Sequence, residues 1–329
     1  MTDPTTHHIE VPGAVLAYDV RDPATPGPHR PLLVFGSPMA ADGFAQLVPH
    51  LDDRTVITLD PRVSGRSVLE EGAEVSYEVH GDDAHRVVAA AGLGPVDVFA
   101  SSGAAVAVLP WLSAHPAEVG TVVAHEPPLI ALLEDCEVLE RVMADIAATY
   151  QELGQGPAMA KFIQVVVHEG PFPDDYLDGP PPDPARFGFS AEDDGRRDDA
   201  LLGRNMRMPT YRPDGDALRA SGVRVVPAVG ATSTGTMPHR GGEALAALLG
   251  VEAVPFPGDH GGFLTNDWSP DNDPAAFAVR LREVLAGGAR GRMTATGRPA
   301  HGSSSTRVQR SASRSAYSAG VQPRDATSV

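Results

Sequence analysis

Short apolar runs that alternate with amphipathic stretches fill the first 128 residues of the chain. Two β-rich runs, 8–11 and 15–20, flank the turn dipeptide Pro12-Gly13 and predict a hairpin. Further apolar runs, each long enough for one strand, lie between helical segments and occur at 32–35, 55–59, 96–100 and 121–125. Strands that alternate with helices are typical of a parallel, doubly wound sheet. We therefore predict an α/β fold with a mostly parallel sheet.

This alternation stops from about residue 129 to residue 217. Residues 129–153 and 158–167 have helical periodicity, and residues 170–197 are rich in proline and acidic side chains, as in a loop region. A mostly helical insertion after a β/α core is typical of a cap over an active site. The sheet pattern then returns, with apolar runs and helical segments at 223–229, 240–249, 252–256 and 274–286.

The composition changes again after Gly287. Residues 288–329 are rich in serine and arginine and have no apolar period, which predicts a disordered tail. The patterns together predict four segments: a first core part, a helical cap, a second core part and the tail, over 1–128, 129–217, 218–287 and 288–329.

The net charge of −17 is unevenly distributed along the chain. Residues 290–329 hold seven arginines and one acidic residue, a net of +6, which leaves −23 on residues 1–289. Such an acidic body repels phosphate backbones, so we expect no nucleic-acid binding by the folded part. We also expect no membrane span, since no stretch approaches about 20 continuous apolar residues, and no signal peptide, since the N-terminus lacks a basic start and an apolar core. With a single cysteine, Cys136, the expected location is the cytoplasm, and the oligomeric state is left open.

The strongest chemical signal lies in the run VDVFASSGAAVAVL, residues 96–109, where an apolar strand passes directly into a helix. Small residues stand two positions before and after Ser102, as in a relaxed form of the G-x-S-x-G nucleophile elbow. Such a turn points the hydroxyl at a helix N-terminus, where free N–H groups favour negative charge. Ser101 is expected to face away from the site. The alternative for this run is a small-residue turn without catalysis.

With this elbow the chain resembles the α/β-hydrolase superfamily over residues 8–286, in particular its cap-bearing esterase, haloperoxidase-like and dehalogenase-like branches. The run Phe35-Gly36-Ser37-Pro38 is similar to the His-Gly-x-Pro strand end of such enzymes, with phenylalanine in place of the histidine. The resemblance implies an oxyanion hole made by the backbone N–H groups of Ser37 and Gly103. Residues 60–67 are similar to a structural D-x-R-G-x-G-x-S loop. No metal and no organic cofactor is implied.

The general base is expected in the run Pro257-Gly258-Asp259-His260-Gly261-Gly262-Phe263. This glycine-rich loop follows an apolar run and precedes the last helix, which is where the superfamily places its catalytic histidine. Glycines on both sides allow the backbone to turn sharply and to present the imidazole of His260. The other eleven histidines lack this setting.

The acid that should orient this histidine is not at its usual place. Most relatives have an aspartate after the strand that corresponds to 223–229, but the following residues 230–235 contain no carboxylate. Some dehalogenase-like members place the acid after the preceding core strand, and Glu126 falls on that position. Its alternative role is a loop-anchoring carboxylate that caps the next helix. Asp259 is a further candidate, although its adjacency to His260 makes the geometry difficult.

The sequence therefore predicts a serine hydrolase with Ser102, His260 and Glu126 as catalytic residues. Its substrate is expected to be a small-molecule carboxylic ester or thioester of small or medium size and apolar character. Two alternatives stay open. The same residues support perhydrolysis, C–C cleavage or cyclisation on this fold, and a ligand-binding homologue that has lost turnover has the same motifs.

Overall fold

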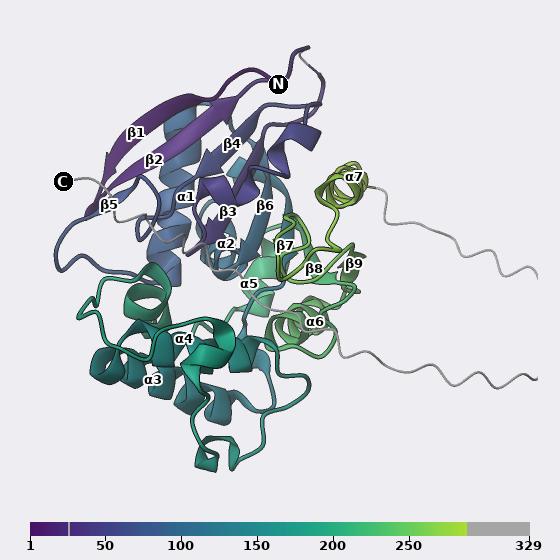
Figure 1. The fold of residues 1–329 in the computed structure, drawn as a ribbon. Coiled ribbons are helices and arrows are strands. Elements are labelled where there is room, and N and C mark those ends of the chain that lie inside the picture. The colour runs from purple at the N-terminus through teal and green to yellow at the C-terminus, as the bar shows by residue number, and fades with distance from the viewer. Residues whose placement is uncertain (26, 288–329) are drawn as a thin grey trace, which may run out of the picture.

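A nine-stranded, mostly parallel sheet forms the centre of the computed structural model, which describes residues 1–25 and 27–287 (Figure 1). The strand order is β1-β2-β4-β3-β6-β7-β8-β9, and β5 pairs with β2. Strands β1 and β2 form an antiparallel hairpin, β2 is antiparallel to β4, and the neighbours from β4 to β9 are parallel. The strands are β1 Thr5–Val11, β2 Ala14–Arg21, β3 Leu32–Ser37, β4 Val56–Leu59, β5 Val68–Leu69, β6 Val96–Ser102, β7 Val119–His125, β8 Arg224–Gly230 and β9 Val254–Phe256.

Helices cover both faces of this sheet. In β3, Leu33 and Phe35 belong to a core cluster shared with α1 and α2, whereas Leu32 and Val34 belong to a cluster shared with α7. All four side chains are buried, and a strand buried on both faces appears in the sequence as a continuous apolar run. The helices are α1 Tyr77–Ala91, α2 Gly103–Ala114, α3 Cys136–Leu153, α4 Gln155–Val166, α5 Gly215–Ala220, α6 Met237–Leu249 and α7 Pro274–Leu285.

The chain between β7 and β8 forms a separate helical group. Figure 1 shows α3 and α4 together beyond one end of the sheet. Leu139 and Tyr150 of α3 and Phe162 of α4 are buried in an apolar cluster of their own. Short helical turns complete the group, at Ile130–Leu132, Tyr176–Asp178, Pro184–Phe187, Ala200–Arg204 and Asn205–Arg207.

The loop after β4 is fixed by two carboxylates. Asp60 accepts hydrogen bonds from the backbone N–H groups of Ala41 and Arg66, at 2.8 and 2.9 Å. Buried Arg62 donates two hydrogen bonds of 2.7 Å to Asp83 of α1. These contacts tie the loop to the neighbouring elements, which is the structural role that the resemblance implies for it.

The predicted α/β fold with a mostly parallel sheet is confirmed, with differences at element ends. Helix α1 begins at Tyr77, where the Ser76 hydroxyl caps it by accepting a hydrogen bond from the Val79 N–H. Helix α3 begins at Cys136, seven residues after the predicted start, since Pro127 and Pro128 precede a short helical turn instead.

The predicted tail, residues 288–329, lies outside the described residues. Within the part of the chain that the structure describes, no helix combines the length and apolar character needed to cross a bilayer.

Candidate active site

Ser102 stands at the turn from β6 into α2, in the conformation of a nucleophile elbow. Its φ of 59° and ψ of −128° place a non-glycine residue in a strained region of backbone space. The turn is tight, since a Cβ built on Gly103 would lie 2.7 Å from the carbonyl oxygen of Ser37. Ala100 and Ala104 are fully buried, and their methyl groups are accommodated in the core beneath the turn.

The strand end opposite the elbow carries Ser37. Strands β3 and β6 pair in parallel, with Ser37 beside Ser102, and the Ser37–Pro38 peptide bond is cis. The Ser37 hydroxyl is buried and accepts a hydrogen bond of 2.9 Å from the side-chain amide of Asn205. Asn205 comes from the helical group between β7 and β8, so this group touches the loop predicted to form the oxyanion hole.

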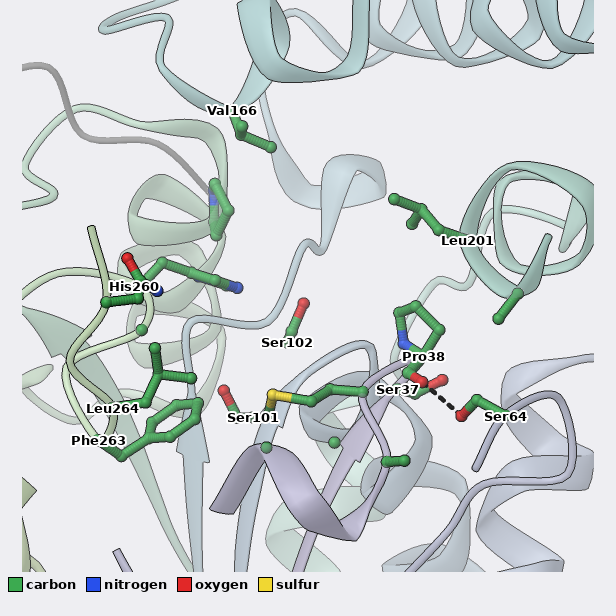
Figure 2. A pocket seen from close by; sticks show the side chains of 18 of the residues that line it. Ser37, Pro38, Ser64, Ser101, Ser102, Val166, Leu201, His260, Phe263 and Leu264 are labelled. Carbon is green, nitrogen blue, oxygen red and sulfur yellow. Dashed lines mark hydrogen bonds between the residues drawn. The ribbon is translucent and has the colours of Figure 1, made fainter. Parts of the chain in front are cut away.

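His260 and Glu126 form a direct pair beside Ser102. The His260 Nδ1 atom lies 2.7 Å from the Glu126 Oε2 atom. Figure 2 shows the imidazole of His260 directed across the cavity toward the Ser102 hydroxyl. The structure thus brings Ser102, His260 and Glu126 together from the ends of β6, the loop after β9 and the end of β7.

Glu126 is completely buried, and its other oxygen is held by groups at the end of β8. Its Oε1 atom accepts a hydrogen bond of 2.8 Å from the Gly230 N–H and a short one from the Ser233 hydroxyl. The His239 Nδ1 atom lies 3.6 Å from the same oxygen. The loop where relatives carry their aspartate therefore supplies hydrogen-bond donors to a carboxylate from the neighbouring strand.

These contacts determine the charge of the pair. Burial by itself disfavours the carboxylate, yet the hydrogen bonds from His239 and His260 hold the pKa of Glu126 well below its usual range. Burial also works against a charged His239, but the contact with Glu126 outweighs it and raises the pKa of His239. Glu126 is therefore an anion at neutral pH, which is the state needed to orient and stabilise a histidine cation.

Two neighbouring residues, Asp259 and Ser101, lie beside the group of Ser102, His260 and Glu126. Asp259 accepts hydrogen bonds from Ser269 at 2.6 Å and from the side chain of Asn272 at 2.9 Å, so its carboxylate fixes the loop that carries His260. The expectation that Ser101 faces away from the site is wrong, because Ser101 lines the same cavity as Ser102 (Figure 2). The positive φ at Ser102 interrupts the regular alternation of side chains along the strand.

Behind Ser101 lies His125, a fully buried histidine surrounded by aromatic rings. Its Nδ1 atom is 3.4 Å from the Ser101 hydroxyl oxygen. Burial lowers the pKa of His125 to about 4, although the charge of adjacent Glu126 acts in the opposite direction. His125 is thus neutral at neutral pH.

Two adjoining cavities, of about 320 and 340 Å³, open at Ser102. The first also reaches His260, Phe263 and Leu264 (Figure 2). The second extends under the helical group and is lined mainly by apolar residues, among them the methionine and aromatic side chains of Phe162, Met206, Tyr211 and Met237. The residues common to both are Ser37, Pro38, Ser102, Val166, Leu201 and Pro238.

The donors on Glu126 were not anticipated from the sequence. Ser233 stands in the loop where the family's aspartate is usual, but a serine there gives no sign that it binds a distant carboxylate. His239 lies in the first turn of α6 and resembles any other helix histidine. Asn205 lies in a segment without clear periodicity. In each case the signal is spatial, since the partners are 107, 113 and 168 positions away in the chain.

The α/β-hydrolase class is defined by an elbow between strand and helix with a histidine–carboxylate pair at the same edge of a parallel sheet. A curated relative and solved structures agree with this class. No family model matches the sequence. The chain is 31% identical to the uncharacterized hydrolase YraK of Bacillus subtilis (strain 168), over 84% of this chain and 94% of that protein. The chain belongs to the α/β-hydrolase superfamily, and it is a hydrolase by this relationship.

Solved structures of the same fold have little sequence in common with this chain. The proline iminopeptidase of Mycobacterium smegmatis is 17% identical with a TM-score of 0.57, covering 86% of this chain and 98% of its own. A thermophilic esterase from Thermogutta terrifontis is 19% identical with a TM-score of 0.57, and the match covers 87% of this chain and 99% of the esterase. An α/β-hydrolase-fold protein from Burkholderia ambifaria is 17% identical with a TM-score of 0.54, and the match covers 84% of this chain and 96% of that protein. At this identity the likeness concerns the fold.

Proposed function

We propose that the protein is a serine hydrolase that cleaves small or medium-sized carboxylic esters or thioesters through an acyl-enzyme. The observation that carries the proposal is the 2.7 Å contact between Glu126 and His260, on a histidine directed at a serine in elbow conformation. A buried anion on Nδ1 leaves Nε2 as the proton acceptor and stabilises the imidazolium that forms. Nothing in this arrangement calls for a metal or an organic cofactor.

In the first half-reaction, His260 takes the proton of the Ser102 hydroxyl while Oγ bonds to the substrate carbonyl carbon. The carbonyl π electrons move to oxygen and form a tetrahedral oxyanion. When this intermediate collapses, the bond to the alcohol or thiol breaks, and the leaving group takes the proton from His260. Water then repeats the sequence on the acyl-enzyme, which releases the carboxylic acid and restores the Ser102 hydroxyl.

The oxyanion would be held by the backbone N–H groups of Ser37 and Gly103. Gly103 opens α2, so its N–H is free of helical hydrogen bonds and lies at the positive end of the helix dipole. Ser37 lies beside the elbow in the neighbouring strand. One such donor contributes on the order of 10²–10³ in rate in comparable hydrolases.

The helical segment 129–217 would act as the cap that selects the substrate. The cavity under it is lined mainly by apolar groups such as Phe162 and Met237, which suits an aliphatic or aromatic arm of the ester. The lining of the adjoining cavity includes the polar residues Asp42, Asp199 and Asn266, which suits an arm with a polar group. Because Ser102 lines both cavities, the two arms of one ester can lie on either side of the nucleophile.

The test is covalent labelling with a fluorophosphonate, followed by a screen of p-nitrophenyl esters and thioesters of increasing acyl length. We expect one adduct, on Ser102, and ester hydrolysis that Ser102→Ala abolishes. Ser101→Ala is the matched control, since it removes a hydroxyl from the same cavity and should leave labelling intact. Labelling that persists in Ser102→Ala would refute the assignment of the nucleophile. A folded wild-type protein without any adduct would favour the ligand-binding alternative.

A further inference from the structure

The carboxylate of Glu126 is shared by two histidines, and the proposed mechanism uses only one of them. His260 contacts Oε2, whereas His239 faces Oε1 from the first turn of α6. The Ser233 hydroxyl lies between Glu126 and His239, since it donates to the Glu126 Oε1 atom and its oxygen is 3.5 Å from the His239 Nδ1 atom. The residues Ser233 and His239 are almost completely buried, at 2% and 6% exposure, so water does not substitute for these contacts.

Hydrogen-bond capacity fixes the direction of this chain of groups. A hydroxyl has one proton, and that of Ser233 points to the Glu126 carboxylate. Ser233 can then only accept from His239, which requires a proton on the His239 Nδ1 atom. Glu126 therefore receives one backbone donor and one hydroxyl on Oε1, with His239 as an ion-pair partner at 3.6 Å, and keeps Oε2 for His260. A carboxylate fixed in this way cannot rotate away from the catalytic histidine.

We propose that Ser233 and His239 are positioning residues that hold Glu126 ionised and aimed at His260, in place of the aspartate that the end of β8 lacks. This inference rests on the proposed function for the role of His260. Ser233 and His239 are needed because Glu126 follows β7 and not β8, where relatives carry the acid. The backbone of Glu126 also has a positive φ of 47°, a conformation that the surrounding contacts must hold. The donors at the end of β8 determine where the displaced carboxylate stands.

The same arrangement couples His239 to the pH dependence of the reaction. The titratable groups around His239 are Glu126, the exposed Glu243 at 3.6 Å from its Nε2 atom, and, through Glu126, His260 and His125. A positive His239 shares the Glu126 anion with the imidazolium that forms on His260 during turnover, so the two cations compete for the same carboxylate. Loss of that positive charge should restrict activity at low pH.

The test compares His239→Asn, His239→Ala and Ser233→Ala over pH 5 to 9, with the exposed Glu252→Gln as the control. Asparagine keeps a donor near Oε1 but has no charge, so we expect kcat to fall less than fivefold and the acidic limb of kcat/KM to move to higher pH, by roughly half a unit. Alanine at either position removes the donor, and kcat should fall at least tenfold with the same direction of shift. Glu252→Gln should change kcat less than twofold.

A purely structural role would lower kcat equally at every pH, and profiles that superimpose on the wild type would overturn the proposal. Proton NMR of the His260 Nδ1–H signal gives a readout that does not depend on turnover. The signal should be present in Ser102→Ala and should shift in Ser233→Ala. If the wild type forms no fluorophosphonate adduct while this signal still shifts, the proposed function fails and the positioning role stands. If the signal is unmoved in Ser233→Ala, the positioning role fails.

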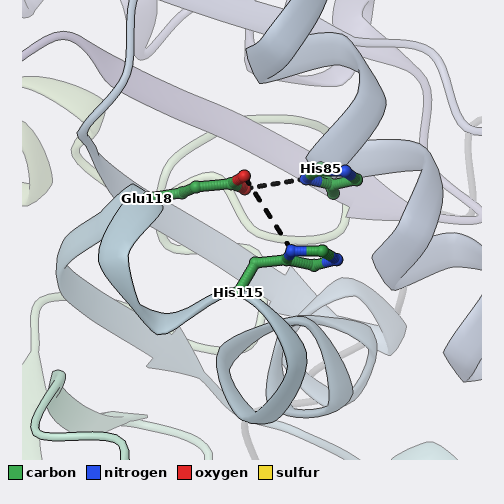
Figure 3. A group of neighbouring side chains, drawn as sticks. All are labelled: His85, His115 and Glu118. Atoms are coloured by element: carbon green, nitrogen blue, oxygen red, sulfur yellow. Dashed lines mark hydrogen bonds and ion pairs between the residues drawn. The ribbon is translucent and has the colours of Figure 1, made fainter.

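A second inference rests on residues at the opposite end of α2. His85 of α1, His115 after α2 and Glu118 in the turn that follows gather there, with one ligand atom from each within 4.8 Å of the others (Figure 3). The His85 Nδ1 atom lies 2.8 Å from Glu118 Oε2, the His115 Nδ1 atom lies 4.0 Å from Oε1, and the two rings stack at 3.8 Å. Helix α2 has 12 residues, so this cluster is about 18 Å from Ser102.

The donor set matches that of a borderline transition metal. Two imidazole nitrogens and one carboxylate leave a fourth position for water, and Zn²⁺ accepts this set. The indole N–H of Trp111 donates to Glu118 Oε2 at 3.0 Å and orients the carboxylate from behind. All three ligands are partly exposed, so an ion can enter without disturbing the core. We infer that His85, His115 and Glu118 form a divalent transition-metal site, in which both rings turn out of their stack toward the ion.

Calorimetric titration of the full chain with ZnCl₂ tests this site. We expect one ion per chain, at least tenfold weaker binding in His115→Asn and Glu118→Gln, and unchanged binding in the control His168→Ala. Equal binding by all four proteins, or no binding at all, would overturn the inference. Because the cluster is remote from Ser102, ester hydrolysis should be the same with and without the ion.

Discussion

Backbone strain in the described residues is concentrated at two positions. Apart from glycines, only Ser102 and Glu126 among them have a positive φ, at 59° and 47°. Such conformations cost on the order of 1–3 kcal/mol each and persist where the surrounding structure fixes them. Both residues follow or end parallel strands of the sheet and meet at the same edge. The coincidence of strain with the histidine–carboxylate pair supports a functional rather than a packing role for this edge.

Glu126→Gln tests the proposed acid. Glutamine keeps the size of the side chain but cannot stabilise an imidazolium, and its amide can present a donor to the His260 Nδ1 atom, which favours the wrong tautomer. We expect kcat for the best p-nitrophenyl ester to fall by roughly 10³–10⁴, with a small change in KM. Glu252→Gln, which removes an exposed carboxylate, serves as the control. A loss of less than tenfold in Glu126→Gln would move the acid to another residue.

At the scale of elements, strands buried on both faces can be predicted from the sequence. Side chains that meet only because their strands are neighbours in the folded sheet cannot. The run 32–35 identifies β3 because both of its faces are apolar, whereas the two-residue β5 has one exposed residue and one half-buried residue and leaves no pattern. The same limit applies to the site. The elbow at Ser102 and the loop of His260 are local in sequence, so their motifs could be recognised. Ser233 contacts Glu126 only because β7 and β8 are neighbours in the folded sheet.

The ion pair between the β4 loop and α1 leads to a stability prediction. Asp83 is almost fully buried and binds Arg62 through two hydrogen bonds, so Asp83→Ala leaves a buried guanidinium without its partner. We expect the free energy of unfolding to fall by about 3–5 kcal/mol in urea titrations. The neighbouring Asp82 pairs with Arg86 at the surface, and Asp82→Ala should cost about 0.5 kcal/mol or less. Equal losses in the two variants would contradict this account.

The contact between the helical group and the core leads to a kinetic prediction. The side-chain amide of Asn205 donates a hydrogen bond to the Ser37 hydroxyl. The Asn205 Oδ1 atom is buried and has no hydrogen-bond partner among the described residues. Asn205→Ala frees the loop that is proposed to donate to the oxyanion, so we expect kcat to fall by about tenfold. The melting temperature should change little, because the side chain makes one hydrogen bond. An unchanged kcat would show that Ser37 is held sufficiently by β3 alone.

For the whole molecule, two buried histidines bear on stability at acid pH. His80 and His125 are both buried, and each has a ring Nε2 atom without a hydrogen-bond partner among the described residues. Burial, together with the positive charge of Arg62, lowers the pKa of His80 to about 3, and burial lowers the pKa of His125 to about 4. The folded protein therefore keeps both rings neutral over a range in which the unfolded chain binds protons.

The sign of the resulting pH dependence follows from proton counting. Below the ordinary histidine pKa of about 6.5 the unfolded state binds more protons than the folded state, so stability falls as the pH is lowered from 6.5 toward 4. We expect urea titrations at pH 5 to give a free energy of unfolding lower than at pH 7 by about 1–2 kcal/mol for each histidine. His125→Phe should remove its share, because phenylalanine does not titrate and the site is already lined by Phe99, Phe256 and Phe277. The exposed His50→Ala should keep the full wild-type slope, and the same slope in His125→Phe would mean that His125 does not limit acid stability.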